Sequence, residues 1–133
     1  PDTPFVRDFL GKLFTLNGTV TSMHDTGDIE VAVEGQSGAV TAPQGSLEGL
    51  TEGADVVLAI RPEDVVAMEE PDGRANCVEG KIDALLFVGD RYECYLDMGR
   101  APVMISLPRE TTRKQGDTVT LHVPAGAISV WRE

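Results

Sequence analysis

The residue types that most often carry chemistry are few in this sequence, and none falls into a catalytic motif. The two histidines, His24 and His122, have no serine or cysteine nucleophile near them in the sequence. The Gly-Lys pairs that begin at Gly11 and Gly80 lack the other residues of a phosphate-binding loop. Signatures of serine hydrolases, zinc proteases and Cys-x-x-Cys proteins are also absent from the sequence. We therefore expect a non-catalytic chain that binds no cofactor of its own.

Metal binding is the remaining chemistry that these residue types could support. A zinc site would need four ligands at unrelated spacings, His24, Cys77, Cys94 and His122. Acidic pairs lack the alternating ligands of a calcium loop; they are Glu63-Asp64, Glu69-Glu70 and Asp25 with Asp28. Surface histidines, solvated acids and a buried free thiol at Cys94 are the favoured interpretation, so we expect no metal site.

The charge balance excludes some classes of partner. Twenty-two acidic and 11 basic residues give a net charge of −11, which repels phosphate backbones and anionic lipids. No apolar run approaches the roughly 18 residues of a membrane helix, and the chain opens without a signal peptide. It also opens without methionine, from which we expect an excerpt of a longer protein. Two cysteines make no disulfide framework, and this favours a reducing compartment.

The elements that position these residues are extended segments that follow one another at short intervals. Residues 56–60 are apolar and rich in branched side chains, which predicts a buried strand. Arg61 precedes Pro62, so its backbone is expected to be extended, and Pro62 should end the strand. Glu63 and Asp64 then suit the positive start of a single helical turn.

The second half of the chain repeats the first. Residues 16–20 match residues 78–82 at an offset of 62, and the Gly27-Asp28 turn matches Gly89-Asp90. We treat Arg91 as a single inserted residue, after which the offset is 63. With this offset Ile29, Val31 and Val33 match Tyr92, Cys94 and Leu96, and Val40, Val56 and Val65 match Val103, Val119 and Ile128. The matched positions are apolar or glycine, which are the residues that set a core and its turns.

This repeat predicts an all-β fold of two oligonucleotide/oligosaccharide-binding-like (OB-like) five-stranded barrels. The expected repeats are residues 13–70 and 71–133, with a turn at residues 69–73 between them. Each unit alone buries little surface, so the two should share a core or exchange a strand. Residues 1–12 predict a short helix whose apolar face is formed by Phe5, Val6, Phe9 and Leu10.

Four segments together carry a family resemblance that extends over nearly the whole chain. They are residues 4–11, the Leu16-Asn17-Gly18 tripeptide, the corner at residues 60–65 and the ending at residues 116–131. The chain resembles the C-terminal transport-associated OB (TOBE) domain of ATP-binding subunits of ABC importers, which is related to the molybdate-binding-type repeat. The opening segment looks most like importers of the iron(III) and polyamine group, but sugar, glycerol-phosphate and sulfate importers share the corner.

The resemblance implies a regulatory and dimerisation domain. The full subunit would carry an ATPase domain before residue 13, with residues 1–12 as the remnant of the connection. ATP and magnesium would bind in that domain, which would couple to membrane permease subunits at the cytoplasmic face of the membrane. Two such C-terminal domains would pack as a homodimer and bias the opening and closing of the ATPase domains.

We expect the corner, the second hairpin and a tryptophan near the end of the chain to supply the dimer or regulatory contacts: Arg61, Glu63, Asp64, Asp90, Arg91, Tyr92 and Trp131. The alternative for Arg61 and Glu63 is that they brace the corner locally, and for Trp131 that it packs on the barrel. Two other functions stay open, a small oxyanion-binding domain of the molybdate type and an unrelated OB-like interaction module.

Overall fold

Alternation of inward and outward side chains builds nearly every strand of this protein. In the first strand, every second residue from Phe14 to Val20 is buried, while the residues between them are more exposed. A computed structural model describes residues 13–45, 47–70, 72–73, 75–99 and 102–133. The helix expected at residues 1–12 lies outside these residues, and the described chain is all-β apart from two short 3₁₀ turns.

Each half of the chain contributes five strands and one 3₁₀ turn. The first half forms β1 (Phe14–Met23), β2 (Asp28–Val33), β3 (Ala39–Pro43), β4 (Asp55–Ile60), η1 (Pro62–Asp64) and β5 (Val66–Met68). The second half forms β6 (Cys77–Phe87), β7 (Arg91–Asp97), β8 (Val103–Pro108), β9 (Thr118–His122), η2 (Ala125–Ala127) and β10 (Ile128–Arg132). The corner after β4 is as expected, with Arg61 extended before Pro62.

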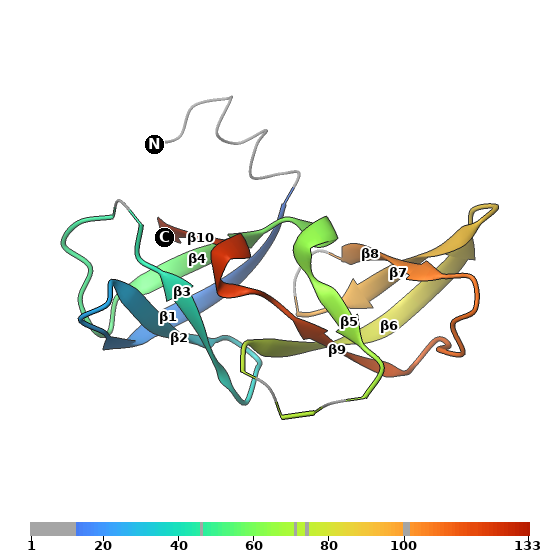
Figure 1. Ribbon diagram of the computed structural model, residues 1–133, viewed down its shortest axis with the longest axis horizontal. Coiled ribbons are helices and arrows are strands. Elements are labelled where there is room, and N and C mark those ends of the chain that lie inside the picture. The colour runs from blue at the N-terminus through green and yellow to red at the C-terminus, as the bar shows by residue number, and fades with distance from the viewer. Residues whose placement is uncertain (1–12, 46, 71, 74, 100–101) are drawn as a thin grey trace.

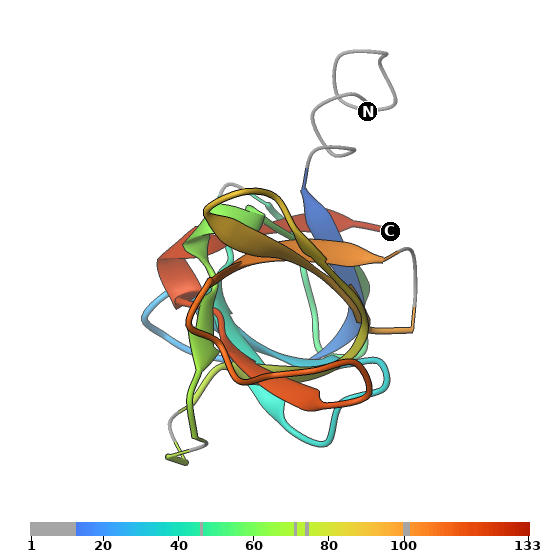
Figure 2. The ribbon, with the colours of Figure 1, turned by 90° about the vertical axis from the view of Figure 1, so that its right-hand side faces the viewer.

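The two halves exchange their last strands. One sheet has the order β10-β4-β1-β2-β3 and the other β5-β9-β6-β7-β8, so each sheet receives one strand from the other half (Figure 1). Figure 2, seen along the long axis, shows that the strands curl around this axis, and Figure 1 shows the two half-barrels placed end to end along it. Exchange of β5 and β10 ties the sheets together and pairs one side of each exchanged strand.

The strand pairings correct one part of the repeat. β1 and β6 both carry an irregularity at the same place, between Val20 and Ser22 and between Ile82 and Ala84. When the two irregularities are superimposed, the strand partners of β1 and β6 align Ile29, Val31 and Val33 with Cys94, Leu96 and Met98. This is an offset of 65. The expected match to Tyr92, Cys94 and Leu96 was wrong, because the second hairpin is longer than one inserted residue allows. The offset returns to 63 at β3 and β8, as predicted.

A single apolar cluster fills both half-barrels. Its fully buried members come from both sheets, including Ile29, Leu58, Ile82, Leu96 and Leu121. In the described part of the chain, no helix has the length and hydrophobicity that spanning a bilayer requires.

Candidate functional site

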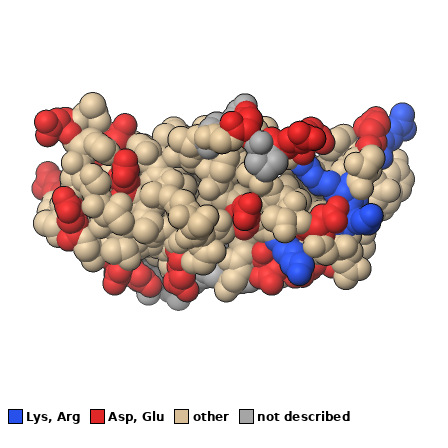
Figure 3. All heavy atoms as spheres, turned by 90° about the horizontal axis from the view of Figure 1, so that it is seen from below, with Lys and Arg blue, Asp and Glu red and all other residues tan. Residues whose placement is uncertain are grey.

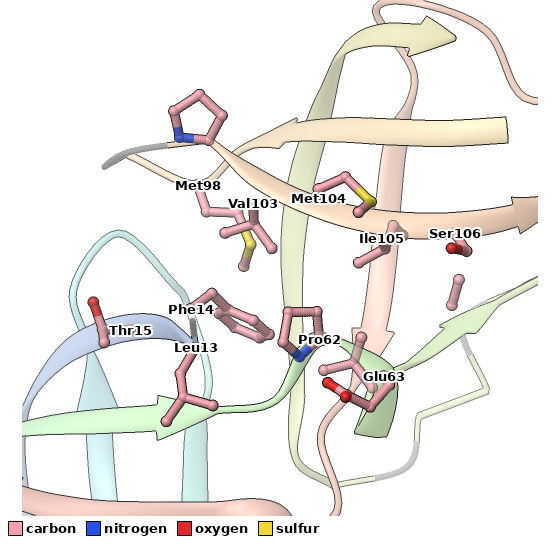
Figure 4. Close-up of a pocket in the computed structure, with 13 residues that line it drawn as sticks. Leu13, Phe14, Thr15, Pro62, Glu63, Met98, Val103, Met104, Ile105 and Ser106 are labelled. Atoms are coloured by element: carbon pink, nitrogen blue, oxygen red, sulfur yellow. The ribbon is translucent and has the colours of Figure 1, made fainter. Parts of the chain in front are cut away.

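A groove of about 880 Å³ lies where the two halves meet. Its walls come from three places, with Met98 at one end: the start of β1 with the preceding Leu13, the corner with β5, and β8 with the preceding Pro102. The corner and β5 contribute Pro62, Glu63, Val65 and Ala67. Figure 4 shows the Phe14 ring pointing towards Pro62, with β8 on the opposite side. Among the described residues that line the groove, Glu63 is the one charged side chain, and Thr15 and Ser106 add hydroxyl groups.

A second and smaller hollow, of about 290 Å³, lies where the halves meet again, and Asn76 lines it. Asn76 is 6% exposed and has a φ of 61°, a left-handed conformation that asparagine tolerates better than most residues. Its Oδ1 accepts a hydrogen bond from the Thr41 N–H at 2.8 Å, and its Nδ2 donates to the Thr41 carbonyl at 2.7 Å. Nδ2 also lies 3.2 Å from the Val123 carbonyl. The side chain therefore joins β3 to the segment that follows β9.

Gln36 makes a similar junction close by. Its Nε2 donates to the Glu79 carbonyl, and its Oε1 accepts from the Glu79 N–H, both at 2.9 Å. An amide side chain thus bonds to both backbone groups of one residue, as a neighbouring strand would. Unlike Asn76, this pair is exposed to solvent, so water competes for the same groups.

The charged corner is arranged around its own backbone. The Asp64 N–H donates to the Arg61 carbonyl at 3.0 Å, and Val65 N–H donates to Pro62 at 3.4 Å. The side chains of Arg61 and Glu63 are exposed, and Glu63 faces the groove. Backbone bonds therefore brace the corner, while two side chains of opposite charge remain accessible to a partner.

The second hairpin places its candidate residues far from the corner. Arg91 pairs with its neighbour Asp90 at 2.8 Å, and both side chains are exposed. Tyr92 packs edge-to-face on Phe87, with ring centroids 5.2 Å apart. Leu86, Phe87 and Val88 are 51%, 55% and 41% exposed, which makes this tip of the second half-barrel apolar. The tip lies at one end of the molecule in Figure 1, whereas η1 lies near its middle.

Trp131 lies on the other sheet, in β10, opposite Val57 of β4. Its indole N–H is buried and has no hydrogen-bond partner among the described residues. The seven residues expected to make contacts are therefore spread over three places, the corner, the hairpin and β10. The structure brings only neighbours in sequence together, and it adds the groove, which sequence patterns did not indicate.

Two side chains of β7, Cys94 and Tyr95, have raised pKa values, and both shifts have structural causes. Burial raises the pKa of the Cys94 thiol, and the positive charge of Arg113 opposes this only in part. Cys94 is fully buried, so it behaves as a small apolar side chain, as expected from its strand position. The Tyr95 hydroxyl donates to Glu93 at 3.0 Å, and this bond raises the pKa of Tyr95. Among the described residues, no three His, Cys, Asp or Glu side chains are grouped to hold a metal ion.

Charge is divided unevenly between the halves. Residues 13–60 contain seven acidic residues and no lysine or arginine. On the face in Figure 3, the basic side chains all lie over the half formed by the second sheet, mixed with acids. A partner that meets the first sheet therefore meets a negative surface, apart from Arg132 in β10.

The sequence of residues 58–131 matches the family model of the TOBE domain. This chain belongs to the TOBE domain family. The match contains the corner after β4 and nearly all of the second half, and it confirms the resemblance that the corner and the ending indicated. It also agrees with the OB-like, all-β architecture of the described residues.

Two relatives of this TOBE domain are ATP-binding subunits of importers. The spermidine/putrescine import ATP-binding protein PotA of Nitrosospira multiformis is 40% identical over 93 residues, which are 68% of this chain and 24% of that protein. The protein of the same name from Trichodesmium erythraeum is 30% identical over 95 residues, with 67% and 24% covered. The chain thus spans about a quarter of the length of these relatives. Their names agree with the iron(III) and polyamine group that the opening segment resembles.

The fold of this TOBE domain is also found in a solved structure. The cytoplasmic molybdate-binding protein ModG, with molybdate bound, aligns with a TM-score of 0.68 over 90% of this chain and 96% of that one. Only 18% of the aligned residues are identical, so the likeness shows the shared fold.

Proposed function

We propose that this chain is the non-catalytic regulatory and dimerisation domain of the ATP-binding subunit of a solute importer of the polyamine or iron(III) group. The observation that carries the proposal is the TOBE match together with two relatives that are named as import ATP-binding proteins. In the full subunit, a preceding ATPase domain would bind ATP and magnesium and contact the permease subunits at the cytoplasmic side of the membrane.

The accessible charged side chains support a contact role for the corner. Arg61 and Glu63 project from a turn whose backbone is held by its own hydrogen bonds, so they present charge at little conformational cost. In a twofold dimer, the same patch appears on both copies, and opposite charges on one patch can pair reciprocally. Asp90 and Arg91 on the hairpin have the same property.

The test uses the full-length subunit, with self-association measured by analytical ultracentrifugation and ATP hydrolysis measured in parallel. Deletion of residues 13–133 should weaken the dimer and change ATP hydrolysis, because the domain biases the closure of the ATPase domains. In the intact subunit, Arg61→Glu should weaken self-association by about tenfold, since it turns an attraction into a like-charge repulsion.

Arg109→Glu is the matched control, because Arg109 is another exposed arginine beside a glutamate, Glu110, at 3.5 Å on a different loop. It should leave self-association unchanged. Unaltered dimerisation and ATP hydrolysis after the deletion would overturn the proposal. Titration of the chain with molybdate in a calorimeter tests the oxyanion alternative, which predicts heat of binding; the negative net charge opposes such a ligand.

A further inference from the structure

Each half-barrel has a gap between the two edge strands of its sheet. β3 is an edge strand of the first sheet and β8 an edge strand of the second. The first seam is the gap between β3 and the segment η2–β10, and the second seam is the gap between β8 and the segment η1–β5. Since η2 contacts β3 and η1 contacts β8, the two seams are equivalent places in the repeated unit.

The first seam is closed by Asn76. Its amide occupies both the N–H and the carbonyl of Thr41, the backbone groups that β3 directs away from β2. This arrangement shows which groups of the edge strand face the seam. It also shows that these groups accept a partner with the geometry of a neighbouring strand.

The second seam has the same backbone, and among the described residues no side chain closes it as Asn76 closes the first. At the repeat offsets, Phe14 takes the place of Asn76, and Met104 takes the place of Thr41. The Tyr95–Met104 pair corresponds to Glu30–Thr41, so the N–H and carbonyl of Met104 face the seam. Phe14 has no amide to offer them. The groove of about 880 Å³ lies along this seam.

The exposed edge has a defined length and chemistry. Pro102 precedes β8 and Pro108 ends it, which confines strand pairing to the residues between them and protects the edge from extended sheet association. Met104 and Ser106 lie at alternate positions, so both direct their backbone groups to the seam. The floor and far wall are apolar, with Phe14, Val65 and Ala67, and Glu63 is the charged residue at the rim.

We propose that the second seam is a binding site for an extended segment of a partner protein, which pairs with β8 as an additional strand. Backbone hydrogen bonds to Met104 and Ser106 would supply affinity, and apolar side chains at alternate positions would enter the groove. A lysine or arginine beside them would meet Glu63, and the net charge of −11 favours such a basic segment. This site does not depend on the proposed importer role.

The probe is a blocked peptide of about seven residues, with alternating valine and threonine and a lysine at each end, titrated into the full chain. We expect saturable binding below about 1 mM, followed by backbone amide shifts in NMR that are centred on β8. A peptide of the same sequence with alternate backbone nitrogens methylated should bind at least about tenfold more weakly, because it cannot form the ladder.

Ser106→Pro removes an outward N–H from the edge and leaves the ladder to β7 in place, so it should weaken binding by about tenfold. Ser106→Ala is the matched control, because it keeps the N–H and removes only the hydroxyl. Glu63→Gln should weaken binding of the lysine peptide and leave that of a peptide with uncharged ends unchanged. Absence of binding at about 1 mM, or equal binding of the methylated peptide, would overturn the proposal.

Two further measurements distinguish the partner segment from two other occupants of the groove. If Phe5→Ser with Phe9→Ser tightens peptide binding by about tenfold or more, the segment of this chain that precedes Leu13 competes for the groove, and the partner assignment fails. If Ser106→Pro reduces self-association in ultracentrifugation, the occupant is a second copy of the chain, and the assignment fails as well.

Discussion

The first and second seams have equivalent backbones and different central residues, and this difference decides whether each edge is satisfied. At the first seam, a buried asparagine supplies the hydrogen bonds that an additional strand would supply. At the second, the equivalent residue is Phe14, which contributes apolar surface to the groove and no hydrogen bond to β8. In a duplicated unit, one seam can thus stabilise the fold while the equivalent seam remains available for binding.

The two halves also depend on each other for stability. Each half donates a terminal strand to the other sheet, and Asn76 and Gln36 join backbone groups across the halves. Conversion of the first seam into an open one should therefore cost stability, whereas changes at the second seam should alter binding with little effect on folding.

Asn76→Ala should have the largest effect. It removes the partners of the Thr41 N–H and carbonyl and of the Val123 carbonyl, and alanine is strained at a φ of 61°. Loss of several partly buried hydrogen bonds is expected to lower the free energy of unfolding by about 3 kcal/mol, measured by urea denaturation. Asn76→Gly is the control for backbone strain, and it should recover about 1 kcal/mol of this loss.

Asn76→Asp sharpens the same test. The carboxylate still accepts from the Thr41 N–H, but it faces the carbonyl oxygens of Thr41 and Val123 without a proton to donate. This variant should be no more stable than Asn76→Ala at neutral pH. A loss below about 1 kcal/mol for all three substitutions would show that the amide does not hold the seam closed.

The paired glycines of β1 and β6 give the next largest effect. A Cβ at Gly18 would overlap Val31 Cγ1 and lie 2.9 Å from the Ala32 carbonyl oxygen, so it meets backbone that cannot move easily. At Gly80 the nearest atom is Met98 Cγ, at 2.9 Å, in a flexible side chain. Gly18→Ala should therefore cost about 2 kcal/mol, and Gly80→Ala less than about 1 kcal/mol, by the same denaturation assay. Equal losses would contradict the looser packing of the second half at this position.

Much of this fold was predictable because its information is local. Alternating apolar residues and glycine turns indicated the strands, and the proline after Arg61 indicated the corner. The alignment of the second hairpin was wrong by two residues at β7 for a physical reason: side chains in a strand alternate with period two, so a shift of two preserves the apolar phase. Strand pairings were needed to detect it, as they were for the exchange of β5 and β10.

The groove and its closed counterpart could not be predicted in the same way. The groove lies between strands that are distant in sequence, and its polar groups belong to the backbone, which has no residue signature. Asn76 is a single asparagine after a turn and follows no periodic pattern, although its left-handed φ is of a kind that asparagine favours. Of the seven predicted contact residues, Glu63 is the one that lines the groove.

Gln36→Ala should have the smallest effect, and it separates the role of an amide from the role of burial. Gln36 makes two bonds of 2.9 Å to the Glu79 backbone, close in geometry to those of Asn76 with Thr41. Its exposed position lets water replace both bonds, so the free energy of unfolding should fall by at most about 1 kcal/mol in the urea assay. Gln36→Glu is the matched control, because it keeps the acceptor for the Glu79 N–H but loses the donor to the Glu79 carbonyl. If Gln36→Ala, which removes two hydrogen bonds against three, cost as much as Asn76→Ala, the burial of Asn76 would not distinguish the closed seam.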